Sequence, residues 1–178
     1  MKYTKDLLWT KGMSVSDLVD GYSAIWFQSS ELSRASNLIE KMKKEGAKVY
    51  LSFTSNMVTT GLRGFFAQVL KLKMASVVCT TVGAIEEDIM KADGEKFILA
   101  SFKADDQELY ERGENRVGNI LITNESYAKL EGKMQNLLLE LYKQKKVWAT
   151  CELLREIGLK LNDENSFLYQ ACLLYTSD

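Results

Sequence analysis

Two short apolar runs, separated by a helical pattern, constrain the fold of this chain more than any other feature. Residues 47–53 read AKVYLSF and residues 75–79 read ASVVC, and each run is compact enough for a buried strand. Between them, residues 60–72 place apolar side chains at the spacing of a helix that buries one face. Buried strands joined through a helix are typical of a parallel sheet covered on both faces. We therefore expect an α/β fold, with a Rossmann-like parallel sheet and flanking helices.

Further periodic stretches complete the predicted arrangement. Helices are expected over residues 14–21 and 30–45, as an N-terminal helical segment, and over residues 125–143 and 146–161. A short helix should follow the second strand, and FILAS at residues 97–101 is a candidate third strand of the sheet. We interpret the apolar stripes of these helices as core packing.

The composition argues against several classes of function. Lys plus Arg is 23 and Asp plus Glu is 24, so the formal net charge of −1 gives no electrostatic basis for binding nucleic acid or an anionic membrane. No apolar run reaches the roughly 20 residues of a membrane helix, and the N-terminus lacks a signal-peptide pattern. The absence of histidine removes Ser-His and Cys-His catalysis and most zinc sites. The three cysteines lack metal-type spacing, so we expect reduced thiols, no metal site and a cytoplasmic location.

Two loops after the predicted strands carry side chains suited to binding a ligand. Residues 54–61 read TSNMVTTG and residues 80–88 read TTVGAIEED. Ligands of open parallel sheets bind beyond the carboxyl ends of the strands, and helix N-termini there favour anions such as a pyrophosphate. We expect Asn56 and Thr81 to point toward a shared pocket at this edge. The GxGxxG fingerprint is absent, and the same hydroxyls and amide also suit simple helix capping, so both interpretations stay open.

An acidic run, Glu86-Glu87-Asp88, lies at the end of the second loop. Carboxylates near the start of a helix are stabilised by its dipole, which is a purely structural reason for them. They are also suited to a polycation, whose ammonium groups they bind through charge-assisted hydrogen bonds. The residues alone do not decide between these two interpretations.

Several motifs together resemble one known family. The string TSNMVTTGLR, followed about 20 residues later by CTTVGAIEEDIMKA, resembles the paired signature of deoxyhypusine synthases. YSAIWFQSSELSRA and ERGENRVGNILITNESYAKLE resemble further segments of that family, the second of which ends in an Asn-x-x-Tyr at Asn124 and Tyr127. Trp26, Val82 and Ala84 depart from the usual family residues, and the larger side chains at the last two positions leave the exact amine substrate open.

The resemblance implies an NAD-dependent enzyme with a Rossmann-type fold that assembles as a homotetramer. NAD oxidises spermidine in this family, and the aminobutyl group passes through an enzyme lysine to a lysine of a translation factor. Two segments match cofactor-binding positions, and an acidic pair matches the amine site. The cofactor positions are Ser55, Asn56, Met57, Val58, Thr59, Thr81, Val82, Gly83 and Glu87, and the amine positions are Glu86 and Glu87.

The resemblance leaves two other functions open and sets expectations about the extent of the chain. The alternatives are an aminobutyl transferase that makes homospermidine and a non-catalytic regulatory paralogue. We expect residues 1–171 to be the N-terminal part of a single domain whose nucleophilic lysine lies in the C-terminal half. Residues 172–178, CLLYTSD, match a translated transposase sequencing adapter, so we expect read-through there and discount Cys172.

Overall fold

The computed structural model describes residues 3–174, and the chain divides into two compact units, Met1–Val49 and Tyr50–Asp178. Residues 175–178, most of the expected adapter sequence, lie outside the described part. The expectation that residues 1–171 belong to one domain stays a prediction.

The N-terminal unit contains two helices, α1 (Val15–Gly21) and α2 (Gln28–Lys44), joined through a short 3-10 helix, η1 (Tyr22–Ala24). Ser14 caps α1, because its hydroxyl accepts a hydrogen bond from the Asp17 backbone N–H at 3.1 Å.

The apolar stripe of α2 was expected in the core, and this prediction is wrong within the unit. Leu32, Leu38 and Ile39 are 53%, 55% and 59% exposed. Periodicity marked this face as apolar, but the unit described here has no element that buries it.

A parallel sheet organises the second unit. Strand β1 (Tyr50–Phe53) pairs in parallel with β2 (Val77–Thr80), and α5 (Val82–Ala92) follows β2. The connection between the strands runs through α3 (Ser55–Met57), a π-helical turn η2 (Val58–Leu62) and α4 (Arg63–Lys71). The predicted α/β fold with a parallel sheet is therefore confirmed. The helical connection begins directly after β1, earlier than the expected start at residue 60.

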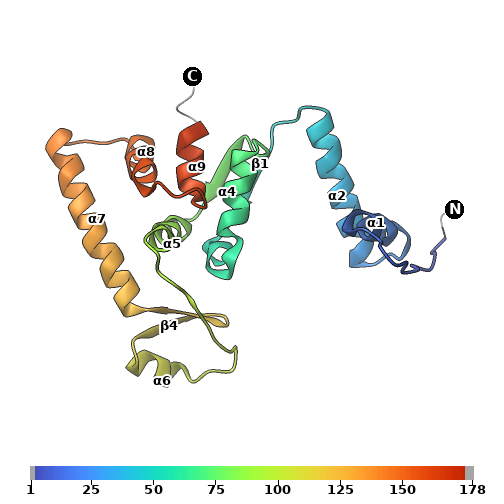
Figure 1. The fold of residues 1–178 in the computed structure, drawn as a ribbon, viewed down its shortest axis with the longest axis horizontal. Coiled ribbons are helices and arrows are strands. Elements are labelled where there is room, and N and C mark those ends of the chain that lie inside the picture. Colours follow the sequence, from blue (N-terminus) through green and yellow to red (C-terminus); the bar gives the residue numbers. More distant parts are fainter. Residues whose placement is uncertain (1–2, 175–178) are drawn as a thin grey trace. The chain divides into compact units, whose positions relative to one another are not determined.

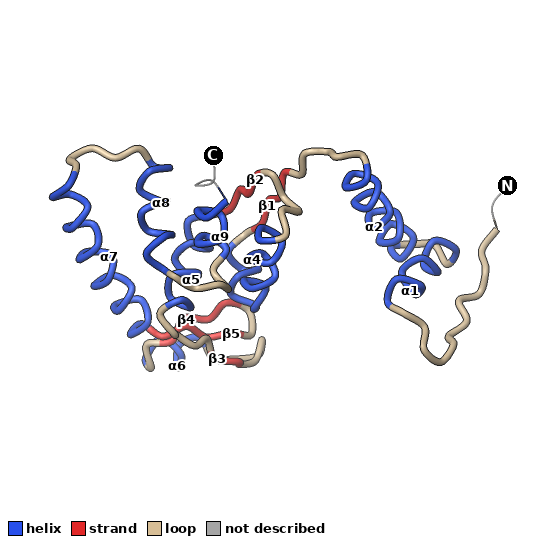
Figure 2. The backbone as a smooth tube through the Cα atoms, turned by 45° about the horizontal axis from the view of Figure 1, so that its top comes forward, coloured by secondary structure: helices blue, strands red, loops and turns tan. Residues whose placement is uncertain are grey.

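A second, antiparallel sheet was not predicted. It contains β3 (Ile98–Leu99), β4 (Glu114–Val117) and β5 (Ile120–Thr123) in the order β3-β5-β4, with α6 (Asp106–Glu111) between β3 and β4. Figure 2 shows the two sheets as separate groups of strands. The expected third strand of the parallel sheet is therefore wrong, because β3 pairs with the buried strand β5 instead.

Three C-terminal helices follow the antiparallel sheet. They are α7 (Asn124–Gln144), α8 (Thr150–Leu161) and α9 (Phe167–Leu174), of which the sequence predicted the first two. Helix α7 packs against α5 and β5. Helix α9 packs against both α4 and α8 (Figure 1). None of the helices within residues 3–174 combines the length and apolar character that a bilayer crossing requires.

Aromatic rings form the centre of this core. The ring of Phe53 on β1 stacks on Phe66 of α4, with centroids 3.7 Å apart, and Phe167 of α9 meets Phe53 edge-on at 5.4 Å. Stacked and edge-on contacts of this kind add to the free energy gained from burying the rings. The sheet, α4 and α9 are therefore joined through a single aromatic cluster.

A buried ionic network crosses the same elements. Asp88 of α5 has no exposure, and its carboxylate accepts hydrogen bonds from Arg63 Nε, from Ser166 Oγ at 2.8 Å and from Leu168 N at 2.9 Å. Arg63 also donates from Nη2 to Asp163 at 2.6 Å. Each charged group therefore has partners that offset its loss of water.

We expect Arg63→Met to lower the free energy of unfolding by about 3–5 kcal/mol, because it leaves Asp88 buried without its cation. Lys71→Met is the matched control. Its ion pair with Glu164 lies between side chains that are 60% and 66% exposed, and its loss should cost less than about 1 kcal/mol. Urea denaturation followed by circular dichroism measures both variants. Similar losses in the two would contradict the assignment of Asp88 as a charge that needs Arg63.

Candidate functional site

The two predicted loops meet at one edge of the parallel sheet. Phe53 and Thr80 are register partners at the ends of their strands, and Thr80 Oγ1 donates a hydrogen bond to the Phe53 carbonyl at 2.8 Å. One residue further on, Thr81 Oγ1 accepts a hydrogen bond from the Ser55 backbone N–H at 3.2 Å. The expected adjacency of the two strands is therefore confirmed, and a side chain of the second loop satisfies the first turn of α3.

Gly83 allows the first turn of α5 to lie close to this junction. A Cβ atom at position 83 would come within 3.3 Å of Ser55 Cβ and 3.4 Å of Ser55 Oγ. Contacts that close require the Ser55 side chain to give by a few tenths of an ångström. Gly83 allows the first turns of α3 and α5 to approach without that adjustment.

The predicted cofactor residues divide into an exposed and a buried group. Val82 is 71% exposed and Met57 is 40% exposed, whereas Val58 and Thr59 are buried at 0% and 3%. Asn56 and Thr81 are both exposed, with Ser55 and Gly83 partly covered between the loops. No hydrogen bond within residues 3–174 joins the side chains of Asn56 and Thr81, so their shared pocket stays a prediction.

The two carboxylates of the predicted amine site have different environments. Glu86 is partly exposed, whereas Glu87 is 7% exposed and lies beside Thr59 of the π turn. Thr59 Oγ1 lies 2.8 Å and 2.7 Å from the two carboxylate oxygens of Glu87 and donates its single proton there. Burial raises the pKa of Glu87, against the opposing effects of the Thr59 hydrogen bond and the positive charge of Lys91.

Lys91 lies one helical turn beyond Glu87 and was not predicted to take part in the site. Its ammonium donates hydrogen bonds to the carbonyl oxygens of Val58 at 2.6 Å and Thr59 at 3.2 Å, and it lies 4.5 Å from the centre of the Phe97 ring. Burial lowers the pKa of Lys91, while the negative charge of Glu87 opposes that effect. The sequence signal was the i, i+4 spacing between a glutamate and a lysine.

Tyr127, at the start of α7, faces the acidic pair from another helix. Burial, followed by the negative charges of Glu87 and Glu86, raises the pKa of its phenol. Tyr127 lies in a segment that resembles the family, but the sequence predicted no role for it. Thr59, Glu87 and Tyr127 thus bring together the π turn, α5 and α7. Within residues 3–174 no cluster of three or more candidate ligands could hold a metal ion.

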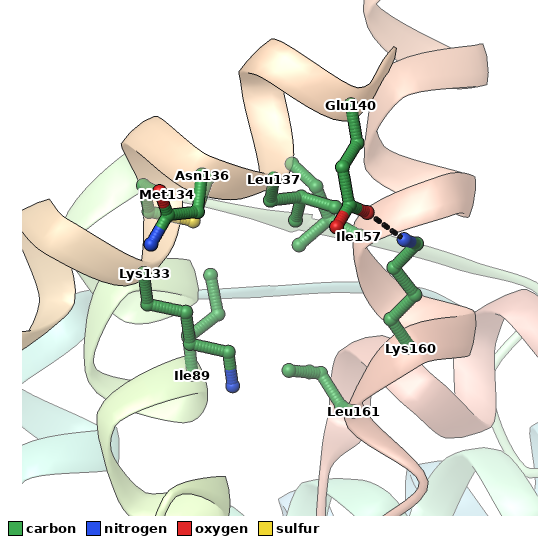
Figure 3. A pocket seen from close by; sticks show the side chains of 9 residues that line it. All are labelled: Ile89, Lys133, Met134, Asn136, Leu137, Glu140, Ile157, Lys160 and Leu161. Atoms are coloured by element: carbon green, nitrogen blue, oxygen red, sulfur yellow. Dashed lines mark hydrogen bonds and ion pairs between the residues drawn. The ribbon is translucent and has the colours of Figure 1, made fainter.

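A separate hollow lies on another face of α5. Figure 3 shows it between α5, α7 and α8, with Ile89 on one side and the ion pair between Lys160 and Glu140, 2.8 Å apart, on another. Its volume is about 250 Å³, and none of the predicted site residues lines it. The residues around Glu87 and those around Ile89 therefore use different faces of one helix.

We expect Glu87→Gln to stabilise the chain relative to the parent at neutral pH. Burial raises the pKa of Glu87 in the folded state, so the protonated side chain contributes to the parent's free energy of unfolding. This contribution is fully present below the ordinary glutamate pKa and is lost as the pH rises through the raised folded pKa. A glutamine cannot ionise, so the difference in free energy of unfolding should grow from acid to neutral pH.

Urea titrations at several pH values test this, with Glu86→Gln as the same change of charge at a partly exposed position. A difference between parent and Glu87→Gln that is constant across pH would show that burial of the charge has no energetic cost.

Comparison with known proteins gives one consistent result. The family model for deoxyhypusine synthase matches residues 17–174. Proteins named "Probable deoxyhypusine synthase" from Thermoplasma volcanium and Thermoplasma acidophilum are 40% and 37% identical to the chain over 172 and 169 residues. Those alignments cover 96% and 94% of this chain but 55% and 54% of the relatives. A protein of the same name from Schizosaccharomyces pombe is 30% identical and covered to 50% of its length.

A crystal structure agrees with the sequence comparison. The Entamoeba histolytica protein assigned as a deoxyhypusine synthase superposes with a TM-score of 0.64 at 28% identity, over 92% of this chain and 58% of that one. The chain therefore spans about half the length of the curated relatives it matches. Its family match nonetheless includes both strands of the parallel sheet, the π turn and all of α5. This chain belongs to the deoxyhypusine synthase family.

Proposed function

We propose that this chain is part of an enzyme that transfers the aminobutyl group of spermidine to a lysine of a translation factor, with NAD as cofactor. This is the first step of hypusine formation. The observation that carries the proposal is the junction between Ser55 and Thr81, which unites two loops of a deoxyhypusine synthase-family chain at one edge of its parallel sheet. Ligands of such sheets bind at this edge.

The cofactor role falls to the residues around that junction. The backbone N–H groups at the starts of α3 and α5 lie at the same edge, where they favour the pyrophosphate of a dinucleotide. Asn56, Met57 and Val82 expose side chains there, and Gly83 leaves room for the close approach of the two turns. NAD bound at this edge would supply a hydride acceptor for the oxidation of the amine.

The amine role falls to Glu86 and Glu87. A carboxylate has about four acceptor positions, and Thr59 occupies one of those on Glu87, so an ammonium group has others to bind. Glu86 is partly exposed and offers a second negative charge one residue away. The partly buried phenol of Tyr127 would form a wall of this site and limit competing water.

The resemblance to the family supports the remaining parts of the proposal. We propose that the full-length enzyme is a cytoplasmic homotetramer. Its nucleophilic lysine would lie in the half of the enzyme that corresponds to the part of the relatives that this chain does not match. No observation favours homospermidine formation or a regulatory role, and the acceptor used by the full-length enzyme distinguishes all three.

In the full-length enzyme, Glu87→Gln should weaken spermidine binding more than NAD binding. A polycation loses a charged partner, whereas a dinucleotide loses at most a hydrogen bond, so we expect about tenfold or more for spermidine and about threefold or less for NAD. Isothermal titration calorimetry measures each ligand separately. Glu131→Gln, a charge-matched change at an exposed position of α7, should alter neither affinity. Equal losses for spermidine and NAD would refute the amine role of Glu87.

The 178-residue chain by itself should show no transferase activity. Transfer through an imine needs a lysine whose position and pKa are set by its site, and no lysine of this chain follows the family's nucleophile pattern. Incubation with NAD, labelled spermidine and a lysine acceptor protein, with a reaction lacking NAD as control, tests this. Labelled transfer above the control would overturn the assignment of the nucleophile to the unmatched part of the relatives.

A further inference from the structure

The turn that carries Thr59 departs from regular helix geometry. Residues Val58–Leu62 form a π-helical turn in which Gly61 has a φ of 100°, a conformation that favours glycine. Turns of this kind are rare and occur frequently at functional sites. The carbonyl oxygens of Val58 and Thr59, in the first half of the turn, accept hydrogen bonds from Lys91.

Lys91 therefore binds the backbone of the same residue, Thr59, whose side chain contacts Glu87. Its ammonium binds the Thr59 carbonyl at 3.2 Å, while the Thr59 hydroxyl contacts Glu87 at 2.7 Å. Lys91 follows Glu87 by four residues on α5, so the two side chains lie on the same face. The ring of Phe97 packs against the ammonium at 4.5 Å and restricts where it can lie.

We propose that Lys91 is a positioning residue, which anchors the π turn so that Thr59 meets Glu87 and places a positive charge on the same face of α5 as the Glu87 carboxylate. The proposal rests on the proposed function, in which Glu87 binds an amine. In that setting the charge of Lys91 extends to lower pH the range over which the site is negative, against the larger opposing effect of burial.

Among the groups around Glu87, Lys91 provides the positive charge that favours the ionised carboxylate. The groups that interact with Glu87 are Glu86 and Lys91 of its own helix, the Thr59 hydroxyl of η2 and Tyr127 of α7. Arg63 of α4 and Asp88 act on Lys91. Arg63 is engaged by two other carboxylates, Asp88 and Asp163. Among residues 3–174, Lys91 is the cation whose charge lowers the pKa of Glu87.

A purely structural role for Lys91 makes a different prediction. If the ammonium only satisfied the carbonyl oxygens of Val58 and Thr59, its removal would weaken the fold and any bound amine to the same extent at every pH. If it also keeps Glu87 charged, its removal moves the titration of Glu87 to higher pH. An arginine at this position retains the charge and the donors, so it should restore the parent's behaviour.

The titration is measured on the chain without any ligand. Carboxyl carbon signals are followed by NMR across pH in the parent, in Lys91→Met and in Lys91→Arg, with the Glu87 signal assigned by its loss in Glu87→Gln. We expect the Glu87 midpoint to rise in Lys91→Met and to return toward the parent in Lys91→Arg. An unchanged midpoint in a folded Lys91→Met chain overturns the proposal.

A second measurement needs no variant at Lys91 and covers the case in which Lys91→Met does not fold. The side-chain nitrogen signal of Lys91 in the parent should change at the midpoint of Glu87, because the negative charge of Glu87 raises the pKa of Lys91. A Lys91 signal that stays constant through that midpoint overturns the proposal.

Spermidine binding, measured by calorimetry across pH, separates this proposal from the proposed function. Lys91→Met should bind spermidine about tenfold more weakly below its raised Glu87 midpoint and equally well or better above it, where the repelling ammonium is gone. A parent chain that binds no spermidine counts against the amine site of this chain, while the titrations still decide the role of Lys91. An equal loss at every pH means that Lys91 is only a structural anchor.

Discussion

Asp88 is a negative charge with no exposure to water, and the arrangement of the second unit depends on satisfying it. Arg63 supplies the cation from α4, while Ser166 and the Leu168 backbone supply neutral donors from the start of α9. A buried carboxylate tolerates little change in the positions of its donors, because each lost hydrogen bond leaves charge without a partner. Helices distant in sequence are therefore held in one orientation around α5.

The orientation of α5 also determines which of its side chains face the candidate site. Glu87 and Lys91 face the π turn, whereas Ile89 faces α7 and α8 (Figure 3). One helix thus contributes to the core and to the candidate site at the same time. Asp88 directly follows Glu87, so the buried network on Asp88 also restrains the part of α5 that carries the acidic pair.

The sequence predicted the features that depend on local pattern. Two compact apolar runs indicated β1 and β2, and the loops after them were correctly expected at one edge. Residues 97–101 form a similar apolar run, but Ile98 and Leu99 pair with β5 and are 43% and 85% exposed, because an apolar run fixes neither the partner nor the burial of a strand. The Gly118-Asn119 turn between β4 and β5 was a usable hairpin signal. The hydrogen bonds from Lys91 to the π turn join residues some 30 positions apart. The local i, i+4 spacing indicated only that Lys91 and Glu87 share a face of α5.

The close approach of Gly83 to Ser55 has a consequence for how this edge can change over time. A Cβ at position 83 would lie 3.3 Å from the Cβ of Ser55, so the Ser55 side chain would have to give by a few tenths of an ångström. The two positions are 28 residues apart in sequence, yet the room for a side chain at one depends on the side chain at the other. Substitutions at the two positions are therefore coupled, and redesign of either loop would have to consider both residues together.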